Sequence, residues 1–173
     1  LTLNPIPHLD PVGSILVPAI LALAPGGIIF GWAKPVPYNP YNLRNRKWGE
    51  ALVALAGPAS NLLIALTFGF AIRFGGVFLS SSVLEIMSVV VFINILLAFF
   101  NLIPIPPLDG SKVLTPLLPY GASIYYNRLK EKIESYGFLA TFFSIFLFVY
   151  LLWQPFISFI SFIFTLITGS HVF

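Results

Sequence analysis

Long apolar runs that contain no Asp, Glu, Lys or Arg dominate this sequence. A helix that crosses a membrane needs roughly 20 consecutive apolar residues. Four runs reach that length: Pro11 to Ala33, Ala51 to Ile72, Ile86 to Leu108 and Gly137 to Phe173. Because each run is a candidate span, the pattern predicts an all-α fold, a polytopic membrane helix bundle with four to five transmembrane segments.

Prolines interrupt several of these runs. Pro18 and Pro25 predict a kinked or broken helix in the first run. The proline-rich segment 101–110 cannot continue a regular helix, so we expect the third span to end there. The last run is too long for one crossing at a rise of about 1.5 Å per residue. We expect a break at Gln154-Pro155, followed by either a second short span or an interfacial tail.

The composition indicates that lipid surrounds the protein. Apolar residues make up 58% of the 173 residues and charged residues only 9%, whereas a soluble domain carries about 25% charged residues. The absence of cysteine excludes disulfides, thiolate metal ligands and cysteine nucleophiles. We expect a single transmembrane domain over residues 1–173. Because the chain opens on Leu1 and its only methionine is Met87, we expect it to be an N-terminally truncated part of a longer reading frame.

The basic residues lie on one side of this topology. Eight of the nine Lys and Arg residues fall in the loops 34–49 and 110–136, and only Arg73 falls on the other side. The positive-inside rule makes both loops cytoplasmic, which predicts a multipass protein of a prokaryotic plasma membrane. Anionic lipid head groups account for the net charge of +3, so no nucleic-acid partner is expected. The proline-rich residues 34–42 predict a short extended cytoplasmic segment.

Asp109 is the first candidate for chemistry. A carboxylate in a span costs about 2.5–3.5 kcal/mol at the centre of a helix and less near the interface, so such residues are usually functional or paired. There is also a structural alternative, in which Asp109 caps a short helix that runs through Leu118, with Lys112 as its charge partner. The residues by themselves leave both interpretations open.

Histidine and asparagine provide the remaining candidates. His8 and His171 are the only histidines, and the sequence contains no His-Glu-x-x-His. As a lone histidine in a rigid turn, His8 fits a hydrogen-bonded turn residue better than a metal ligand. Asn61 lies within a predicted span, where its amide either joins neighbouring helices or donates to a substrate carbonyl or an oxyanion. Asn94 and Asn101 raise the same question on the third span.

Three motif segments follow one another in the first two-thirds of the chain. They are Leu1-Thr-Leu-Asn-Pro continuing to Gly13, residues 31–40 running on to Gly57-Pro-Ala-Ser-Asn61, and Asn101 to Gly110. Together they resemble the site-2 protease family of intramembrane zinc metalloproteases. Their order and spacing fit that family from Leu1 to about Leu118.

The resemblance implies a zinc site. In the family, a helix with the sequence His-Glu-x-x-His lies just upstream of the segment that here begins at Leu1. The third zinc ligand is the aspartate of an Asp-Gly motif, which corresponds to Asp109, and the element at 57–61 corresponds to residues that line the active site. His8 matches a histidine common in this subgroup, without an assigned role. Two of three protein ligands and the glutamate base are absent from these 173 residues, so we expect this chain alone to be inactive.

The resemblance also implies a reaction and a substrate. Zinc and the glutamate would hydrolyse a peptide bond of a membrane-spanning protein, after the substrate helix has unwound. The extended residues 34–42 are expected to offer a strand edge to the unwound chain.

Other classes of protein fit fewer residues. An aspartyl protease needs two carboxylates that share a proton, but Asp10 and Asp109 lie on opposite sides of the predicted topology. A serine protease would have to pair Ser123 with the distant His171. The alternative outside the enzymes is a non-catalytic or transporter-like multipass membrane protein, in which Asp109 is structural or relays protons.

Overall fold

The computed structural model describes Asn45 and residues 48–170, which belong to the unit Leu43–Phe173. The described residues form helices and loops, with no strand among them. The helices are α2 (Gly49–Gly75), the short 3-10 helix η4 (Gly76–Phe78), α3 (Ser81–Asn101), α4 (Asp109–Leu117), α5 (Tyr120–Ser135) and α6 (Phe138–Thr168). The all-α prediction is confirmed. The first predicted span and the extended segment 34–42 lie outside the described residues.

Three of these helical segments are long and apolar enough to cross a membrane: Gly49–Phe78, Ser81–Asn101 and Phe143–Thr168. They correspond to the second, third and fourth apolar runs of the sequence. The first is α2 continued by η4, and it runs through Pro58 without interruption. α3 ends at Asn101, immediately before the proline-rich loop, as the sequence predicts.

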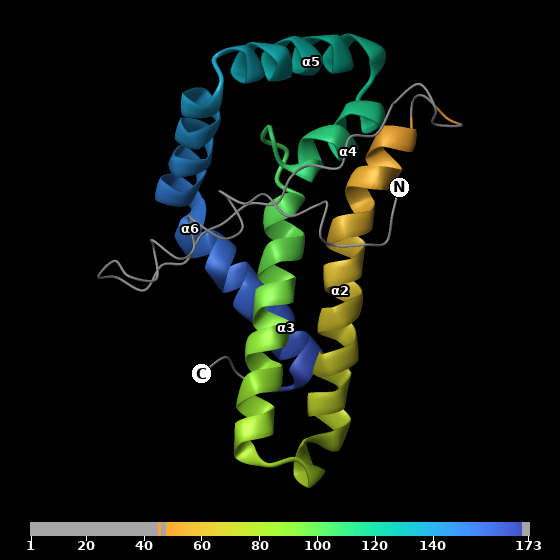
Figure 1. Ribbon diagram of the computed structural model, residues 1–173, viewed down its shortest axis with the longest axis vertical. Helices are drawn as coiled ribbons and strands as arrows, with labels where there is room; N and C mark the ends of the chain where they lie inside the picture. Colours follow the sequence, from red (N-terminus) through yellow and green to blue (C-terminus); the bar gives the residue numbers. More distant parts are fainter. Residues whose placement is uncertain (1–44, 46–47, 171–173) are drawn as a thin grey trace, which may run out of the picture. The chain divides into compact units, whose positions relative to one another are not determined.

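The fourth apolar run forms one helix rather than two. α6 extends over 31 residues with Pro155 inside it, so the expected end of a helix at Gln154-Pro155 is wrong. Figure 1 shows instead that α6 changes direction about midway along its length. A proline removes one backbone hydrogen bond and bends a helix, whereas ending the helix in lipid would leave several backbone groups unpaired. The run therefore supplies a single bent span.

The core of the bundle lies where α2, α3 and α6 meet. Buried side chains come from all three helices: Ala65 and Ile72 from α2, Val91 and Ile95 from α3, and Ile160, Phe164 and Ile167 from α6. The outward faces of the same helices carry exposed large apolar side chains, such as Leu63 and Ile86. Helices that are apolar on both their inner and outer faces are expected where lipid replaces water.

α4 and α5 lie at one end of this bundle. Figure 1 shows α5 lying across that end, at a steep angle to α2 and α3. α4 follows the loop 102–108 and contacts α2. It matches the short helix predicted through Leu118 and ends one residue earlier. Because α4 begins at Asp109, this end of the bundle contains the candidate site.

Candidate functional site

Asp109 is the first residue of α4, and its carboxylate faces Gly57 on α2. A Cβ atom added at Gly57 would lie 3.8 Å from the Oδ2 atom of Asp109. Glycine therefore leaves room in front of the carboxylate, which any larger side chain at this position would occupy. Since Asp109 is half-buried, the carboxylate is partly withdrawn from the surroundings of the bundle.

Asp109 does not cap its own helix. The cap position belongs to Leu108, and no side chain makes a cap hydrogen bond there. The Ser111 hydroxyl donates to the Leu108 carbonyl over 2.8 Å. In the described part of the chain, the Asp109 carboxylate makes no hydrogen bond or ion pair, either with Lys112 or with another residue. A cap paired with Lys112 therefore does not account for this carboxylate.

Gly110 fixes the position of Asp109 through a close backbone approach. A Cβ atom added at Gly110 would overlap the carbonyl group of Leu102 and crowd the carbonyl oxygen of Ile103. The loop after α3 thus folds back against the first turn of α4, and only glycine fits between them. The sequence motif includes this glycine, but its steric role is visible only once the loop is in place.

A second contact joins the same loop to α5. The Tyr126 hydroxyl donates a hydrogen bond to the Pro104 carbonyl oxygen over 3.0 Å. Burial raises the pKa of Tyr126 above its usual value of 10.0, because the charged phenolate would lose hydration. The phenol therefore stays protonated at physiological pH and keeps donating. Nothing in the sequence pattern pointed to this contact.

The three asparagine candidates differ in what their amides do. The Nδ2 atom of Asn94 donates to the Val90 carbonyl over 2.8 Å. The Nδ2 atom of Asn101 likewise donates to the carbonyl of Leu97 over 2.9 Å. Among the described residues, the Asn61 amide makes no hydrogen bond.

Asn61 lies on the same face of α2 as Gly57. The two positions are four residues apart, which is about one helical turn. Asn61 is also half-buried, so its amide is partly withdrawn from the surroundings. Asn61 therefore lies near the contact between Gly57 and Asp109, with an amide that no described residue engages. A residue that donates a hydrogen bond to a bound ligand needs both features. His8 and His171 lie outside the described residues.

The residues at this site do not hold a metal by themselves. Within the described residues there is no group of three His, Cys, Asp or Glu side chains that could bind a metal ion. A zinc site in a protein uses at least three protein ligands. What this part of the chain offers is one unengaged carboxylate, of the kind that serves as a single zinc ligand.

Comparisons with known proteins bear on the family. Residues 72–148, which contain Asp109, match the model of peptidase family M50. The chain is 37% identical over 147 residues to "Putative zinc metalloprotease YwhC" of Bacillus subtilis (strain 168), a match that covers 80% of this chain and 61% of that protein. It is 34% identical over 123 residues to "Putative zinc metalloprotease Rip2" of Mycolicibacterium smegmatis, covering 68% of this chain and 44% of that protein. No solved structure matches the chain.

The alignment lengths show how much of a relative this chain represents. The chain spans 61% of the length of the Bacillus subtilis protein and 44% of the Mycolicibacterium smegmatis protein. The matched residues include the whole of α3, α4 and α5, so the match covers the loop and helix that position the carboxylate. The chain belongs to peptidase family M50, the site-2 protease family that its motifs resemble.

Proposed function

We propose that this chain is part of an intramembrane zinc metalloprotease that hydrolyses peptide bonds of membrane-spanning proteins, and that Asp109 is one of its zinc ligands. The observation that carries the proposal is the Asp109 carboxylate itself, which has room at Gly57 and no partner among the described residues. The relatives named "Putative zinc metalloprotease" support the same activity.

The remaining ligands have to come from residues other than those described. Two histidines and a glutamate in a His-Glu-x-x-His helix would complete the site, and the 173 residues contain no such sequence. A single carboxylate does not hold zinc against water at useful affinity. We therefore expect the 173-residue chain to be inactive without that helix. When bound, zinc supplies a Lewis acid and lowers the pKa of a water molecule.

The residues of this chain would then have distinct tasks. Asp109 binds the metal, Gly57 keeps space in front of it, and Asn61 donates its amide to the carbonyl of the unwound substrate. Asn101 is a second candidate donor. One of its two amide hydrogens bonds to the Leu97 carbonyl, and the other could be donated to the substrate. His8 remains a candidate for a place near the site.

The charge distribution supports a cytoplasmic position for the site. Among the described basic residues, Lys112, Arg128, Lys130 and Lys132 lie on α4 and α5. Arg73 lies near the far end of α2. The positive-inside rule then assigns the end of the bundle with Asp109 to the cytoplasmic face of a plasma membrane.

Cleavage by the full-length protein tests the proposal. The full-length protein is reconstituted in lipid vesicles with a single-span reporter protein as substrate. We expect Asp109→Asn to lower cleavage by about 100-fold or more and to lower the bound zinc measured by elemental analysis. Glu85→Gln, which removes an exposed carboxylate from the first turns of α3, serves as the matched control and should change neither quantity. Full cleavage with unchanged zinc content in Asp109→Asn would refute the ligand assignment.

A further inference from the structure

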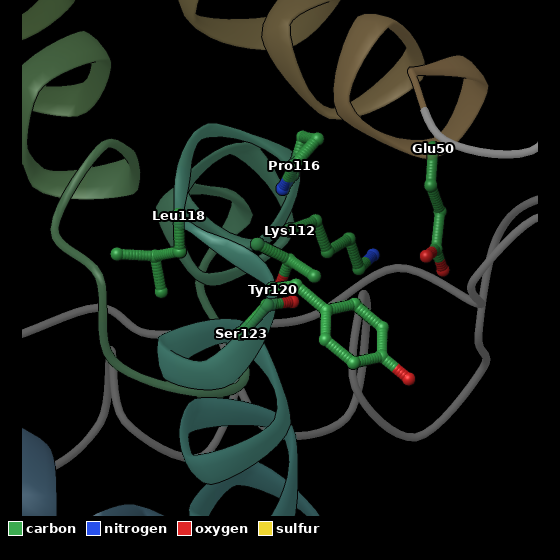
Figure 2. A pocket seen from close by; sticks show the side chains of 7 residues that line it. Glu50, Lys112, Pro116, Leu118, Tyr120 and Ser123 are labelled. Carbon is green, nitrogen blue, oxygen red and sulfur yellow. The ribbon is translucent and has the colours of Figure 1, made fainter.

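A cavity of about 340 Å³ opens between the start of α2, the last turns of α4 and the start of α5. It is lined by Glu50, Lys112, Thr115, Pro116, Leu118, Tyr120 and Ser123. We call it the Lys112 pocket. Figure 2 shows Ser123 and Lys112 on its α4–α5 side, with the Lys112 side chain extending toward Glu50 on the α2 side and the Tyr120 hydroxyl pointing away from Lys112 and Ser123. None of these residues has a task in the proposed site.

The Lys112 pocket presents several hydrogen-bond donors that have no partner. Within residues 48–170, the Lys112 ammonium and the hydroxyls of Tyr120 and Ser123 make no hydrogen bond or ion pair. The Thr115 hydroxyl differs, because it already donates to the Ser111 carbonyl over 3.0 Å. A cavity lined by a few polar groups is a usual form of a binding site, and Tyr120 is the most exposed of these groups, at 85%. The Lys112 ammonium and the two hydroxyls can bind a negatively charged oxygen, while Glu50 contributes one acidic group to the opposite part of the lining.

The pocket lies in line with the Asp109 site. Asp109 and Pro116 are seven residues apart on α4, two helical turns, so they share a face of that helix. Gly57 and Glu50 are likewise seven residues apart on α2. Gly57 lies opposite Asp109, and Glu50 lines the pocket together with Pro116. The two helices thus run alongside each other from the Asp109 contact to the pocket.

This spacing corresponds to a short length of substrate. Two helical turns amount to about 10 Å, and an extended chain advances about 3.3–3.6 Å per residue. The end of the pocket at Pro116 and Glu50 is therefore about three residues of an extended peptide away from Asp109, and the side chain of Lys112, which begins one turn from Asp109, extends toward Glu50. It lies towards the start of α2, the end of the bundle that the basic residues assign to the cytoplasm.

We propose that the Lys112 pocket is a specificity subsite of the protease, which binds an Asp or Glu side chain of the substrate about three residues from the cleaved bond on its cytoplasmic side. The proposal rests on the protease function proposed above. Lys112 pairs with the substrate carboxylate, and the hydroxyls of Tyr120 and Ser123 donate hydrogen bonds to it. An acidic residue just beyond a membrane span would then direct which bond is cut.

A polypeptide fits the pocket better than a lipid head group. Glu50 lines the same cavity as Lys112, so the cavity presents a carboxylate as well as an ammonium group. A peptide also carries backbone N–H groups, which donate hydrogen bonds to a carboxylate such as that of Glu50. A phosphate diester carries no such donor. The pocket is also continuous with the contact between Gly57 and Asp109. A peptide whose cleaved bond lies beside Asp109 would extend along α2 and α4 into the pocket, which favours a peptide as the occupant.

A charge-exchange experiment tests this subsite. The full-length protein in vesicles is given three single-span reporters that differ only in the third residue on the cytoplasmic side of the cleaved bond: Glu, Gln or Lys. We expect the wild-type protein to favour Glu over Lys by about ten-fold in kcat/KM. Lys112→Glu should reverse this order, and Lys112→Gln should abolish it. Lys132→Glu changes an exposed lysine of α5 that does not line the pocket and should keep the wild-type order.

The outcomes separate the subsite from the protease itself. If Lys112→Glu and Lys112→Gln cleave all three reporters in the wild-type order, the subsite is wrong and the protease function stands. An equal loss for all three reporters that depends on the content of anionic lipid would also overturn the subsite, because it would indicate a bound head group. If the wild-type protein cleaves no reporter and releases no product from any membrane-spanning protein, the protease proposal fails together with the subsite.

Discussion

Helix α2 faces a neighbouring helix with a glycine at two positions, and the two contacts differ in kind. At Gly69, an added Cβ atom would overlap the side chain of Ile167 on α6, beside the buried Phe164. At Gly57, an added Cβ atom would lie 3.8 Å from the Asp109 carboxylate. Small residues in membrane helices usually allow tight apolar packing, as Gly69 does. Gly57 instead leaves space for a polar group, so the role of each glycine depends on the residue that faces it.

The two regions are also held by different means. On the α6 side, the Arg73 Nη1 atom donates to the Leu166 carbonyl over 2.6 Å. That bond satisfies one of the carbonyls that the end of α6 leaves without a helical partner. On the α4 side, the contacts involve the loop before Asp109, through Gly110 and the hydrogen bond between Tyr126 and Pro104. The first region holds helices together, and the second holds one carboxylate in place.

The same substitution, glycine to alanine, should therefore have different effects at different positions. Gly110→Ala is expected to have the largest. Its Cβ would meet a backbone carbonyl of the loop 102–108, which cannot rotate away as a side chain can. We expect a loss of about 3 kcal/mol or more in the free energy of unfolding, together with loss of cleavage, because Asp109 moves with the loop. Unfolding of the purified protein in detergent measures the first quantity.

Gly121→Ala provides the control for this variant. Gly121 lies in the first turn of α5, and an added Cβ atom there meets nothing within 4 Å. Alanine is a better helix former than glycine by roughly 0.5–1 kcal/mol, so Gly121→Ala should be neutral or slightly stabilising. A Gly110→Ala variant as stable as Gly121→Ala would contradict the close approach of loop and helix.

Gly69→Ala should have an intermediate effect that is confined to stability. The added methyl group meets the Ile167 side chain, and overpacking of this kind costs about 1–3 kcal/mol. Cleavage per folded molecule should stay near the wild-type value, because the contact lies three turns of α2 beyond Gly57. Combining the variant with Ile167→Ala removes the methyl that it meets. The double variant should therefore be more stable than the sum of the two single changes predicts.

The sequence predicts the spans well, for a physical reason. Freedom from charge over about 20 residues is a strong signal for a membrane helix, and it correctly placed the helices of α2 and α3. Asp109 stood out because a carboxylate beside a span is costly. Its place in an ordered set of motifs favours a ligand, which stays a prediction, and the structure has Leu108 rather than Asp109 at the cap position.

The features that the sequence missed depend on surroundings that a local pattern does not contain. The break predicted at Pro155 follows a rule for helices in water, but lipid penalises unpaired backbone groups and keeps α6 continuous. The steric role of Gly110 depends on how the loop 102–108 folds back. The Lys112 pocket forms only because the start of α5 returns to the start of α2. Each of these requires elements that are separate in the sequence to meet.

Gly57→Ala should have the smallest effect on stability. At 3.8 Å from the Asp109 Oδ2 atom, an added methyl group makes an ordinary contact, and the gain in helix propensity is roughly 0.5–1 kcal/mol. The variant should be as stable as the wild-type protein or slightly more so. Cleavage should nevertheless fall, because the methyl group occupies part of the space in front of the carboxylate.

Gly57→Leu sharpens that distinction. A leucine side chain at this position has to displace either the carboxylate or whatever the carboxylate binds. A displacement of about 1 Å costs about 100-fold in rate, so we expect cleavage to fall by that factor and bound zinc to fall with it. Leucine packs well among membrane helices, so unfolding in detergent should change less than in Gly69→Ala. If Gly57→Leu unfolds the protein while its folded fraction still cleaves normally, Gly57 serves packing, as Gly69 does, and the two regions do not differ.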